Sequence, residues 1–289
     1  KKLKTIKPNV FYIYMSNVIL LNKYKIIEEI GSGSFGKVFK AQSLKSKSDM
    51  AIKIQYNNVA NVLKNEAKIY KYLKDTTIVP KIKNYGTEEN FNFLVLDLLG
   101  ENLIECISIL TKKEWLKIMV EMIEILQTLH NKEIIHRDIK PDNFLFCREK
   151  KKLFIIDFGL SLYFNNTEYK NKKIIGSVKY CSRTVHNFNG VYYKDDMESL
   201  IYSFLNCIGI ELPWNDLILK LDTSTNETRD FIIKEIGSSK EKICDTLIIT
   251  PNIYDEYITY IKYCRNLKPK EKPNYNYLKG LFNNLLELF

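Results

Sequence analysis

The chain has 289 residues, of which 45% are hydrophobic and 27% are charged, and its formal net charge is +10. This composition excludes an intrinsically disordered chain, and the length is sufficient for one large domain or two modest lobes with buried cores. A positive charge permits nucleic acid, an anionic membrane or an acidic protein as partner. Because the lysines are spread along the chain, we interpret the charge mainly as solvated surface and expect no specific nucleic-acid binding.

The cysteines and the apolar segments indicate an intracellular protein, in the cytoplasm or the nucleus, without a membrane anchor. None of the six cysteines belongs to a C-x-x-C pair, which favours reduced core thiols over disulfides or structural zinc. The longest N-terminal apolar run, residues 10–21, is interrupted by Ser16 and Asn17 and is shorter than the roughly 20 residues of a membrane span. It follows a basic start, as in a signal peptide, but no small-residue cleavage site follows it. We expect residues 1–18 to be a poorly ordered N-terminal extension.

A strand-like segment, residues 24–30, leads into the glycine-rich residues 31–38 (GSGSFGKV). Glycines there allow positive φ and close approach of the backbone, so that amide groups can lie against phosphate oxygens. A dinucleotide-binding fold with the same G-x-G-x-x-G pattern would continue as a helix. Residues 37–41 have the pattern of a strand instead, which predicts a hairpin folded over a nucleotide.

The next two predicted elements are a strand over residues 50–54 and a helix over residues 61–74. A lysine in such a strand is usually an exposed residue of an alternating pattern. The V-A-I-K-like setting of Lys53, downstream of the glycine-rich segment, instead favours contact with the α- and β-phosphates of a nucleotide. Glu66 on the predicted helix is within reach of this lysine, so we predict an ion pair between them over an ordinary surface glutamate.

Residues 91–98 predict an apolar strand, which we interpret as the link between a sheet-rich lobe and a helical one. Its backbone would hydrogen-bond an adenine ring, with Leu96 at the back of the pocket, although an ordinary core strand fits the same pattern. Farther along, Thr111 and Glu114 have the spacing of a capping box. They open a predicted helix whose apolar residues recur every three and four positions, as in a helix that faces a core.

Two short polar segments carry the groups for chemistry. Residues 136–143 (HRDIKPDN) place a carboxylate, an ammonium and a carboxamide in one tight turn, from Asp138, Lys140 and Asn143. Asp157 begins the sequence DFG directly after an apolar strand predicted at residues 153–156. Groups of these kinds suit a site for phosphate, magnesium and a hydroxyl nucleophile.

In their order and spacing, these segments resemble the eukaryotic protein kinases. More narrowly, residues 19–289 resemble the casein kinase 1 family. Like its members, the chain lacks an A-P-E motif, and residues 180–184 (YCSRT) stand where the family has a serine-isoleucine-asparagine run. The stretches that carry the resemblance are 30–38 (IGSGSFGKV), 96–100 (LDLLG), 135–146 (IHRDIKPDNFLF), 155–160 (IIDFGL), 195–200 (DDMESL), 212–214 (LPW) and 263–282 (YCRNLKPKEKPNYNYLKGLF).

The resemblance implies an α+β, two-lobed protein kinase fold. Residues 19–97 would form a small N-terminal lobe with an antiparallel sheet and one main helix, and residues 98–289 a larger, mostly helical lobe. It also implies a monomeric serine/threonine protein kinase that uses ATP and Mg²⁺. The residues expected to contact the nucleotide are Gly31, Ser32, Gly33, Ser34, Phe35, Gly36, Val38, Ala51, Lys53, Leu96, Asp97, Leu99 and Leu145.

The resemblance assigns roles to the polar residues. Asp138 would orient the substrate hydroxyl and accept its proton, and Lys140 would contact the γ-phosphate, as in serine/threonine rather than tyrosine kinases. Asn143 and Asp157 would hold magnesium. Asp196, before an apolar helix predicted at residues 197–208, would bind the backbone of the 136–143 segment, although a helix-capping role alone is the simpler alternative. Ser177 would be a structural neighbour of Asp138 rather than a phosphorylation switch.

Substrate choice follows less directly from the sequence. Casein kinase 1 enzymes prefer acidic or already phosphorylated residues upstream of the target, and Lys172 and Lys179 match two of their basic anion-site positions. The family's further basic cluster, after the Leu-Pro-Trp motif, is absent from residues 221–230 (LDTSTNETRD). We expect protein substrates that are acidic or phosphorylated.

Two alternatives belong to other functional classes. A pseudokinase scaffold would have lost a catalytic group, and the sequence retains all of them, although the segment before Gly176 is shorter than usual. A small-molecule or dinucleotide enzyme would share only the glycine-rich segment and would have a helix after it.

Overall fold

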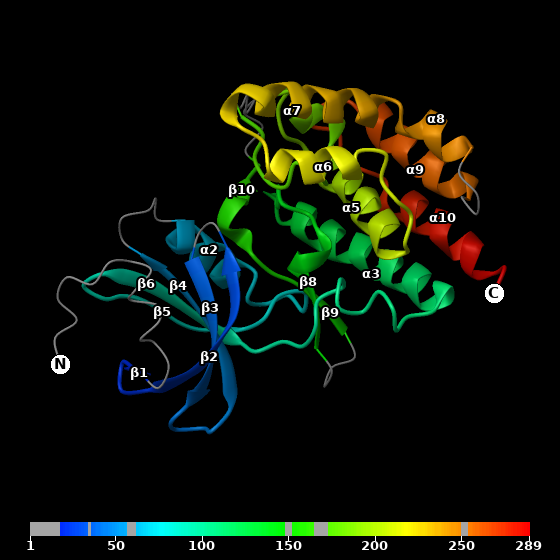
Figure 1. Ribbon diagram of the computed structural model, residues 1–289. Helices are drawn as coiled ribbons and strands as arrows, with labels where there is room; N and C mark the ends of the chain where they lie inside the picture. The colour runs from blue at the N-terminus through cyan, green and yellow to red at the C-terminus, as the bar shows by residue number, and fades with distance from the viewer. Residues whose placement is uncertain (1–17, 34–35, 57–61, 148–151, 165–172, 250–253) are drawn as a thin grey trace. The chain divides into compact units, whose positions relative to one another are not determined.

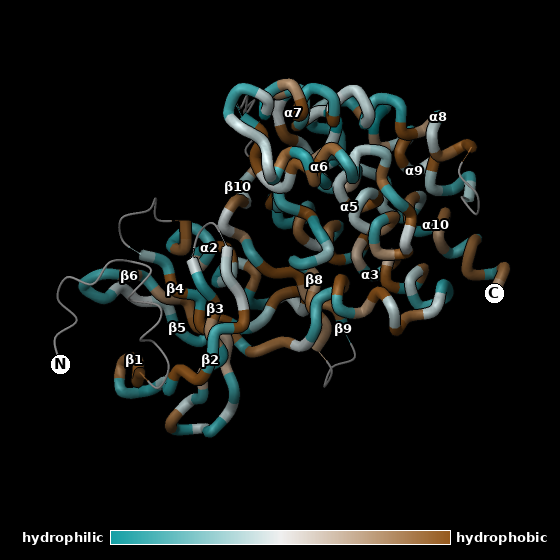
Figure 2. Tube along the Cα trace, in the orientation of Figure 1, coloured by the Kyte–Doolittle hydropathy of each residue, from teal (hydrophilic) through white to brown (hydrophobic). Residues whose placement is uncertain are grey.

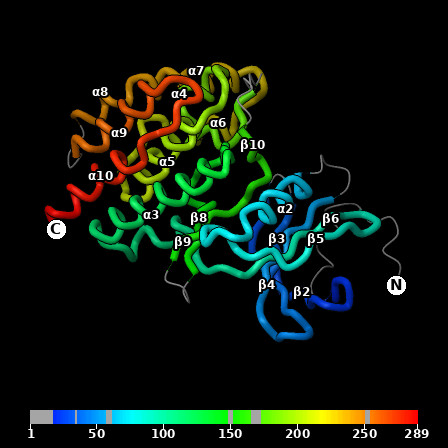
Figure 3. The backbone as a smooth tube through the Cα atoms, turned by 180° about the vertical axis from the view of Figure 1, so that it is seen from behind, coloured from blue at the N-terminus to red at the C-terminus, as the bar shows by residue number. Residues whose placement is uncertain are grey.

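The computed structural model describes residues 18–33, 36–56, 62–147, 152–164, 173–249 and 254–289. The chain divides into two compact units, and the first comprises residues 1–100, 147–150 and 156–159. Figures 1 and 3 show a sheet with one helix in the first unit and a mostly helical second unit. This composition confirms the predicted fold class. The predicted N-terminal extension lies almost wholly outside the described residues, and the domain limits at residues 18 and 97 stay predictions.

The first unit is built on a six-stranded antiparallel sheet in the order β1-β2-β3-β4-β6-β5. β3 begins within the glycine-rich segment and pairs antiparallel with β2, so the predicted hairpin is present, and a strand stands where a dinucleotide-binding fold would have a helix. The strands are β1 (Ile19–Leu20), β2 (Tyr24–Gly33), β3 (Gly36–Ser43), β4 (Asp49–Tyr56), β5 (Ile82–Thr87) and β6 (Phe91–Asp97).

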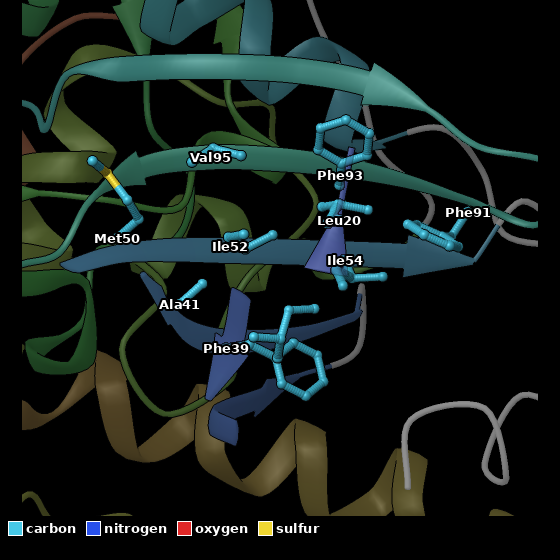
Figure 4. Packing of buried hydrophobic residues seen from close by; sticks show 10 residues of the cluster. Leu20, Phe39, Ala41, Met50, Ile52, Ile54, Phe91, Phe93 and Val95 are labelled. Carbon is cyan, nitrogen blue, oxygen red and sulfur yellow. The ribbon is translucent and has the colours of Figure 1, made fainter. Parts of the chain in front are cut away.

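One face of this sheet carries the apolar core of the first unit (Figure 4). Met50, Ile52 and Ile54 are alternate residues of β4, so they project to the same face. β3 and β6 contribute further buried side chains to that face, among them Phe39 and Phe93. α2 (Val62–Tyr72) packs against β5 and β6 and is slightly shorter than the predicted helix.

The second unit is mostly helical, and along its helices apolar and polar residues alternate, as expected when each helix buries one side (Figure 2). The capping box predicted at Thr111 and Glu114 is present at the start of α3. The helices are α3 (Lys112–Asn131), α4 (Arg183–His186), α5 (Tyr193–Cys207), α6 (Asn215–Asp222), α7 (Asn226–Glu241), α8 (Ile243–Ile248), α9 (Asp255–Asn266) and α10 (Tyr275–Leu286).

α5 begins earlier than predicted, at Tyr193. The cause is Asp195, whose Oδ2 accepts a hydrogen bond from the backbone N–H of Tyr192 at 2.7 Å. That bond satisfies a donor at the helix terminus and extends the helix by one turn. Asp196 therefore lies inside the first turn of α5 instead of before the helix.

Short elements frame the segment that contains Asp138. β7 (Ile134–Ile135) precedes it and pairs with β10 (Leu162–Tyr163), while β8 (Phe144–Cys147) follows it and pairs with β9 (Lys152–Ile155). Between β7 and β8 the chain forms the 3-10 turn η1 (Pro141–Asn143), and a second such turn, η2 (Phe158–Leu160), follows Asp157. The polar segment is thus held at both ends by strand pairs.

All six cysteines are free thiols, and four of them are buried. Within the described ranges, no group of three or more His, Cys, Asp or Glu side chains is arranged to hold a metal ion. Among the helices that the structure describes, none combines the length and the hydropathy needed to cross a membrane.

Candidate active site

Strand pairing gathers several of the predicted nucleotide-contacting residues on one face of the first unit's sheet. Val38 is paired with both Gly31 and Lys53 across the neighbouring strands, and Ala51 is paired with Leu96. Directly paired residues of antiparallel strands project to the same face, and so do alternate residues of one strand. Lys53 therefore shares a face with these small and apolar residues, opposite the apolar core, and that face suits a flat ring with phosphates.

The glycine-rich hairpin is closed by Gly33 and Gly36, which are paired across its end; Ser32 precedes them on β2. Gly36 has φ +142°, and a Cβ atom there would overlap the carbonyl oxygen of Ile54 on β4. Only glycine therefore lets β3 approach β4 this closely at the hairpin end. The predicted contacts Ser34 and Phe35 lie outside the described residues.

Lys53 is the centre of an ion-pair cluster in the first unit. Its Nζ lies 2.8 Å from Glu66 Oε2 and 2.8 Å from Asp157 Oδ1. The predicted pair with Glu66 is present. The contact with Asp157, from a segment far along the chain, was not anticipated from the sequence.

The cluster is buried, and burial sets its electrostatics. Glu66 is 1% exposed, and burial raises the pKa of its carboxyl to about 7 in spite of the nearby ammonium. Burial alone would lower the pKa of Lys53, but the carboxylates of Glu66 and Asp157 outweigh it and raise that pKa. Lys53 therefore carries a full positive charge on the face that is predicted to receive phosphates.

Asp157 is held in an unusual backbone conformation, with φ 65°. Its backbone N–H donates to the hydroxyl of Tyr70 on α2 at 3.3 Å, and its Oδ1 accepts from the N–H of Gly159 at 3.4 Å. Phe158 is fully buried with its ring edge-on to Tyr70, the ring centroids 5.0 Å apart. Phe158 is therefore a packing residue directly after Asp157.

The remaining predicted nucleotide contacts lie at the end of β6 and on β8. The side chain of Asp97 pairs with Lys83 at 2.8 Å, and its backbone N–H donates to Lys81 O at 3.1 Å. Because its N–H is already bonded, the Asp97 carbonyl is the backbone group that could accept a hydrogen bond from an adenine ring. Leu99 is partly buried at the end of the first unit, and Leu145 is partly buried on β8 of the second.

In the second unit, Asp138 is 8% exposed and surrounded by donors. Lys140 Nζ lies 3.0 Å from its Oδ2, and the backbone N–H of Ser177 donates to its Oδ1 at 2.9 Å. Asn143 donates from Nδ2 to the Asp138 carbonyl at 2.8 Å. Because the Asn143 nitrogen is committed to Asp138, the amide oxygen is the end that can bind a cation.

A buried network holds the backbone of this segment. The carboxylate of Asp196 accepts the N–H of His136 at 2.7 Å and the N–H of Arg137 at 3.0 Å, which confirms the predicted partner of Asp196. Burial opposes the charge of Asp196, but hydrogen bonding to His130 and the neighbouring imidazoles lower its pKa below the usual value. His136 is fully buried and accepts a hydrogen bond from the N–H of Asp138 at 3.3 Å, so it packs beneath this segment.

Arg137 and Gly176 bring the Ser177 segment against Asp138. Arg137 has φ 68°, and its Nε donates to the carbonyl of Leu160. Gly176 has φ +89°, and a Cβ atom there would overlap the Arg137 carbonyl oxygen. Glycine is therefore required for the close approach that puts the Ser177 N–H on Asp138.

Only part of the predicted anion site can be described, because Lys172 lies outside the described residues. Lys179 is half-buried, with its Nζ 5.3 Å from the centroid of the Tyr180 ring. Burial lowers the pKa of Lys179, and the carboxylate of Asp142 opposes that shift.

Sequence reasoning missed several residues that support these groups. His130 is one of them. Its Nε2 is hydrogen-bonded to Asp196 Oδ2 at 3.2 Å, and its Nδ1 is hydrogen-bonded to the hydroxyl of Tyr275 at 2.7 Å. A lone histidine in a core-facing helix carries no signal for such a role.

The geometry agrees with a comparison of the chain with known families. Residues 24–280 match the protein kinase domain, a family whose members use ATP to phosphorylate proteins. The match spans the glycine-rich hairpin, Lys53, Asp138 and Asp157, and it covers most of the 289 residues. The narrower resemblance to casein kinase 1 is not tested by it and stays a prediction. The chain belongs to the protein kinase domain family.

Proposed function

We propose that this protein is an active casein kinase 1-like serine/threonine kinase. It transfers the γ-phosphoryl group of ATP to Ser or Thr of proteins and prefers acidic or phosphorylated sites. The observation that carries the proposal is the setting of Asp138, whose carboxylate contacts both the Lys140 ammonium and the Ser177 N–H.

This setting supports different roles for Asp138 and Lys140 in phosphoryl transfer. The Asp138 carboxylate lies beside the Lys140 ammonium, where it can orient a substrate hydroxyl and take its proton. Lys140, with its side chain 29% exposed, can reach an incoming γ-phosphate. An ammonium at this place neutralises charge that builds up on the transferred group, which is the main form of catalysis in this reaction.

Lys53 and the two oxygen ligands complete the proposal. Lys53 would bind the α- and β-phosphates, held in place by Glu66. The side chain of Asp157 is 30% exposed, and the Asn143 amide presents its oxygen, so both offer the hard oxygen ligands that Mg²⁺ prefers. Bound Mg²⁺ would neutralise phosphate charge during transfer.

The substrate preference is supported by charge. Lys179 lies two residues after Ser177, whose backbone N–H contacts Asp138. Lys140 favours serine and threonine over tyrosine as the acceptor, by the resemblance described above.

The test is phosphate transfer from radiolabelled ATP and Mg²⁺ to a matched peptide panel. The panel contains acidic peptides with Ser, Thr or Tyr as the only acceptor, a neutral Ser peptide and a Ser peptide with an upstream phosphoserine. We expect transfer to Ser and Thr but not to Tyr, fastest with upstream acidic residues or phosphate. Equal transfer to the neutral and the acidic Ser peptides would contradict the substrate preference.

The control is Asp157→Asn, which is expected to abolish transfer while the protein stays folded by circular dichroism. Transfer that survived this change would contradict the assignment of Asp157 to magnesium. A nucleotide-dependent thermal shift with no transfer to any peptide would instead support a pseudokinase scaffold.

A further inference from the structure

Lys240 on α7 is a fully buried lysine whose contacts are mainly backbone carbonyls. Its Nζ donates to Val178 O at 2.7 Å and to Cys181 O at 2.6 Å, and it lies 3.3 Å from Cys181 Sγ. Burial lowers the pKa of Lys240, but both carbonyl bonds can be donated by the charged or the neutral amine. A buried amine is costly to desolvate, so its hydrogen bonds must hold the acceptors in place.

Aromatic residues enclose the same amine. Lys240 Nζ lies 5.3 Å from the ring centroid of Trp214 and 6.0 Å from that of Tyr202. The indole Nε1 of Trp214 donates to Lys179 O at 2.8 Å. Lys240 and Trp214 together therefore fix the carbonyls of residues 178, 179 and 181.

The segment that they fix is the one in contact with Asp138. Ser177 donates its backbone N–H to Asp138 Oδ1, and its carbonyl accepts the N–H of Cys181 at 2.8 Å. Residues 177–181 thus form a closed turn, with Asp138 at one end and Lys240 underneath. A displacement of the turn would move the donor that orients Asp138.

The end of α7 that carries Lys240 is itself anchored. Arg265 on α9 donates from Nη2 to Lys240 O at 2.7 Å and from Nε to Glu198 on α5 at 3.0 Å. The backbone that carries the amine is therefore tied through Arg265 to α9 and α5, so the amine can set the position of the turn.

We propose that Lys240 is a positioning residue for peptide phosphorylation. It holds residues 177–181 as a preformed docking surface for the substrate backbone next to Asp138. The inference rests on the proposed kinase function and adds a determinant of peptide binding that lies outside the reacting groups. Loss of the amine removes the Lys240 donor from the buried carbonyl of Cys181 and from the part-buried carbonyl of Val178, and the turn loses its fixed shape.

The test compares Lys240→Met with Lys234→Met, a change of an exposed lysine on the same helix. The Met side chain keeps the apolar volume of lysine and removes the donor. We expect Lys240→Met to lower kcat/KM for the peptide by about tenfold, the scale of a lost hydrogen bond to a charged group. KM for ATP should stay unchanged, and Lys234→Met should match the wild type. Lys240→Arg, which retains donors, should recover part of the loss.

Hydrogen exchange of the peptide that covers residues 176–183 supplies a readout independent of activity. We expect faster exchange there in Lys240→Met and unchanged exchange in α3 and α5. If Lys240→Met does not fold, Trp214→Phe removes a donor to Lys179 O and should also lower kcat/KM for the peptide.

Unchanged exchange with an unchanged kcat/KM for the peptide would overturn the inference, and so would equal losses for peptide and ATP with faster exchange throughout the unit. A wild-type protein that transfers no phosphate would contradict the proposed kinase function. The exchange experiment would still decide whether Lys240 holds the turn.

Discussion

At the scale of single residues, the carboxylates of Asp157 and Asp138 lie at, or directly after, a backbone position that ordinary residues avoid. Asp157 itself has φ 65°, and Arg137, directly before Asp138, has φ 68°. The left-handed conformation costs a non-glycine residue roughly 1–2 kcal/mol. It persists here because Tyr70 holds the N–H of Asp157 and Asp196 holds the N–H of Arg137. The left-handed backbone sets the direction of each carboxylate. The neighbours that stabilise this backbone are therefore as necessary for the site as the carboxylates.

A substitution at Gly176 tests the close packing of the Ser177 segment against Asp138. Gly176→Ala introduces a Cβ atom where the Arg137 carbonyl lies, at a residue whose φ is +89°. We expect a loss of stability greater than the roughly 1–2 kcal/mol of the backbone conformation alone. We also expect kcat/KM to fall by about a hundredfold, because the Ser177 N–H leaves Asp138. Urea unfolding and peptide phosphorylation measure the two effects.

Gly209 supplies the matched control for this prediction. Its φ is +79°, but a Cβ atom there would meet nothing within 4 Å. Gly209→Ala should therefore show the conformational cost alone, with normal activity. Equal losses of stability in the two variants would contradict an overlap at Gly176.

His186 predicts how stability changes with pH. Burial, with help from the Lys240 charge, lowers its pKa from 6.5 to about 4, and its Nε2 contacts Ile233 O at 2.7 Å. Between these values the unfolded chain binds a proton that the native state does not, so the free energy of unfolding falls as pH falls. His186→Gln keeps an amide donor for Ile233 O and removes the titration. We expect the free energy of unfolding of the wild type, relative to that of the variant, to decline from pH 6.5 towards pH 4 in urea unfolding. If the two free energies change with pH in parallel, the prediction is contradicted.

At the scale of elements, the polar segment around Asp138 depends on helices that are distant in sequence. Asp196 of α5 binds its backbone, His130 of α3 binds Asp196, and Tyr275 at the start of α10 binds His130. α3 and α10 also pack side by side in Figures 1 and 3. The last helix of the chain is therefore connected to the candidate base through three buried side chains.

Tyr275→Phe isolates the last link of this network. The change removes the hydroxyl 2.7 Å from His130 Nδ1 and keeps the ring. We expect a loss of about 1 kcal/mol in the free energy of unfolding, as for a typical buried hydrogen bond. Tyr277→Phe, on the same helix and 42% exposed, should change it by less than about 0.5 kcal/mol. If both variants unfold at the same urea concentration as the wild type, the hydroxyl contributes nothing and the network ends at His130.

At the scale of the whole molecule, the parts predicted from sequence are those that short segments specify. The hairpin after the glycines, the capping box of α3 and the pair of Lys53 with Glu66 each depend on residues close in sequence. Together with the resemblance, these segments were sufficient for the fold class.

The parts that could not be predicted depend on tertiary contacts. Lys53 and Asp157 are 104 residues apart, and no local pattern reports that they meet. Lys240 is a lysine in a polar helix, which sequence alone assigns to solvent. The predicted start of α5 was wrong because either of two adjacent aspartates could cap the helix. In the structure Asp195 caps it, and Asp196 binds the polar segment.

The buried ion pair of Arg265 on α9 with Glu198 on α5 joins two helices of the second unit. Arg265 Nε contacts Glu198 Oε1 at 3.0 Å, its Nη2 contacts the Tyr202 hydroxyl at 2.9 Å, and both side chains are at most 9% exposed. Arg265→Met leaves a buried carboxylate without its cation, which costs about 3–5 kcal/mol in comparable pairs. In Glu198→Gln the arginine keeps a neutral acceptor, so the loss should be smaller. The double variant should be more stable than the sum of the two losses predicts, with a coupling of about 1–3 kcal/mol in urea unfolding. Additive losses would mean that Arg265 and Glu198 contribute to stability independently and do not act as a pair.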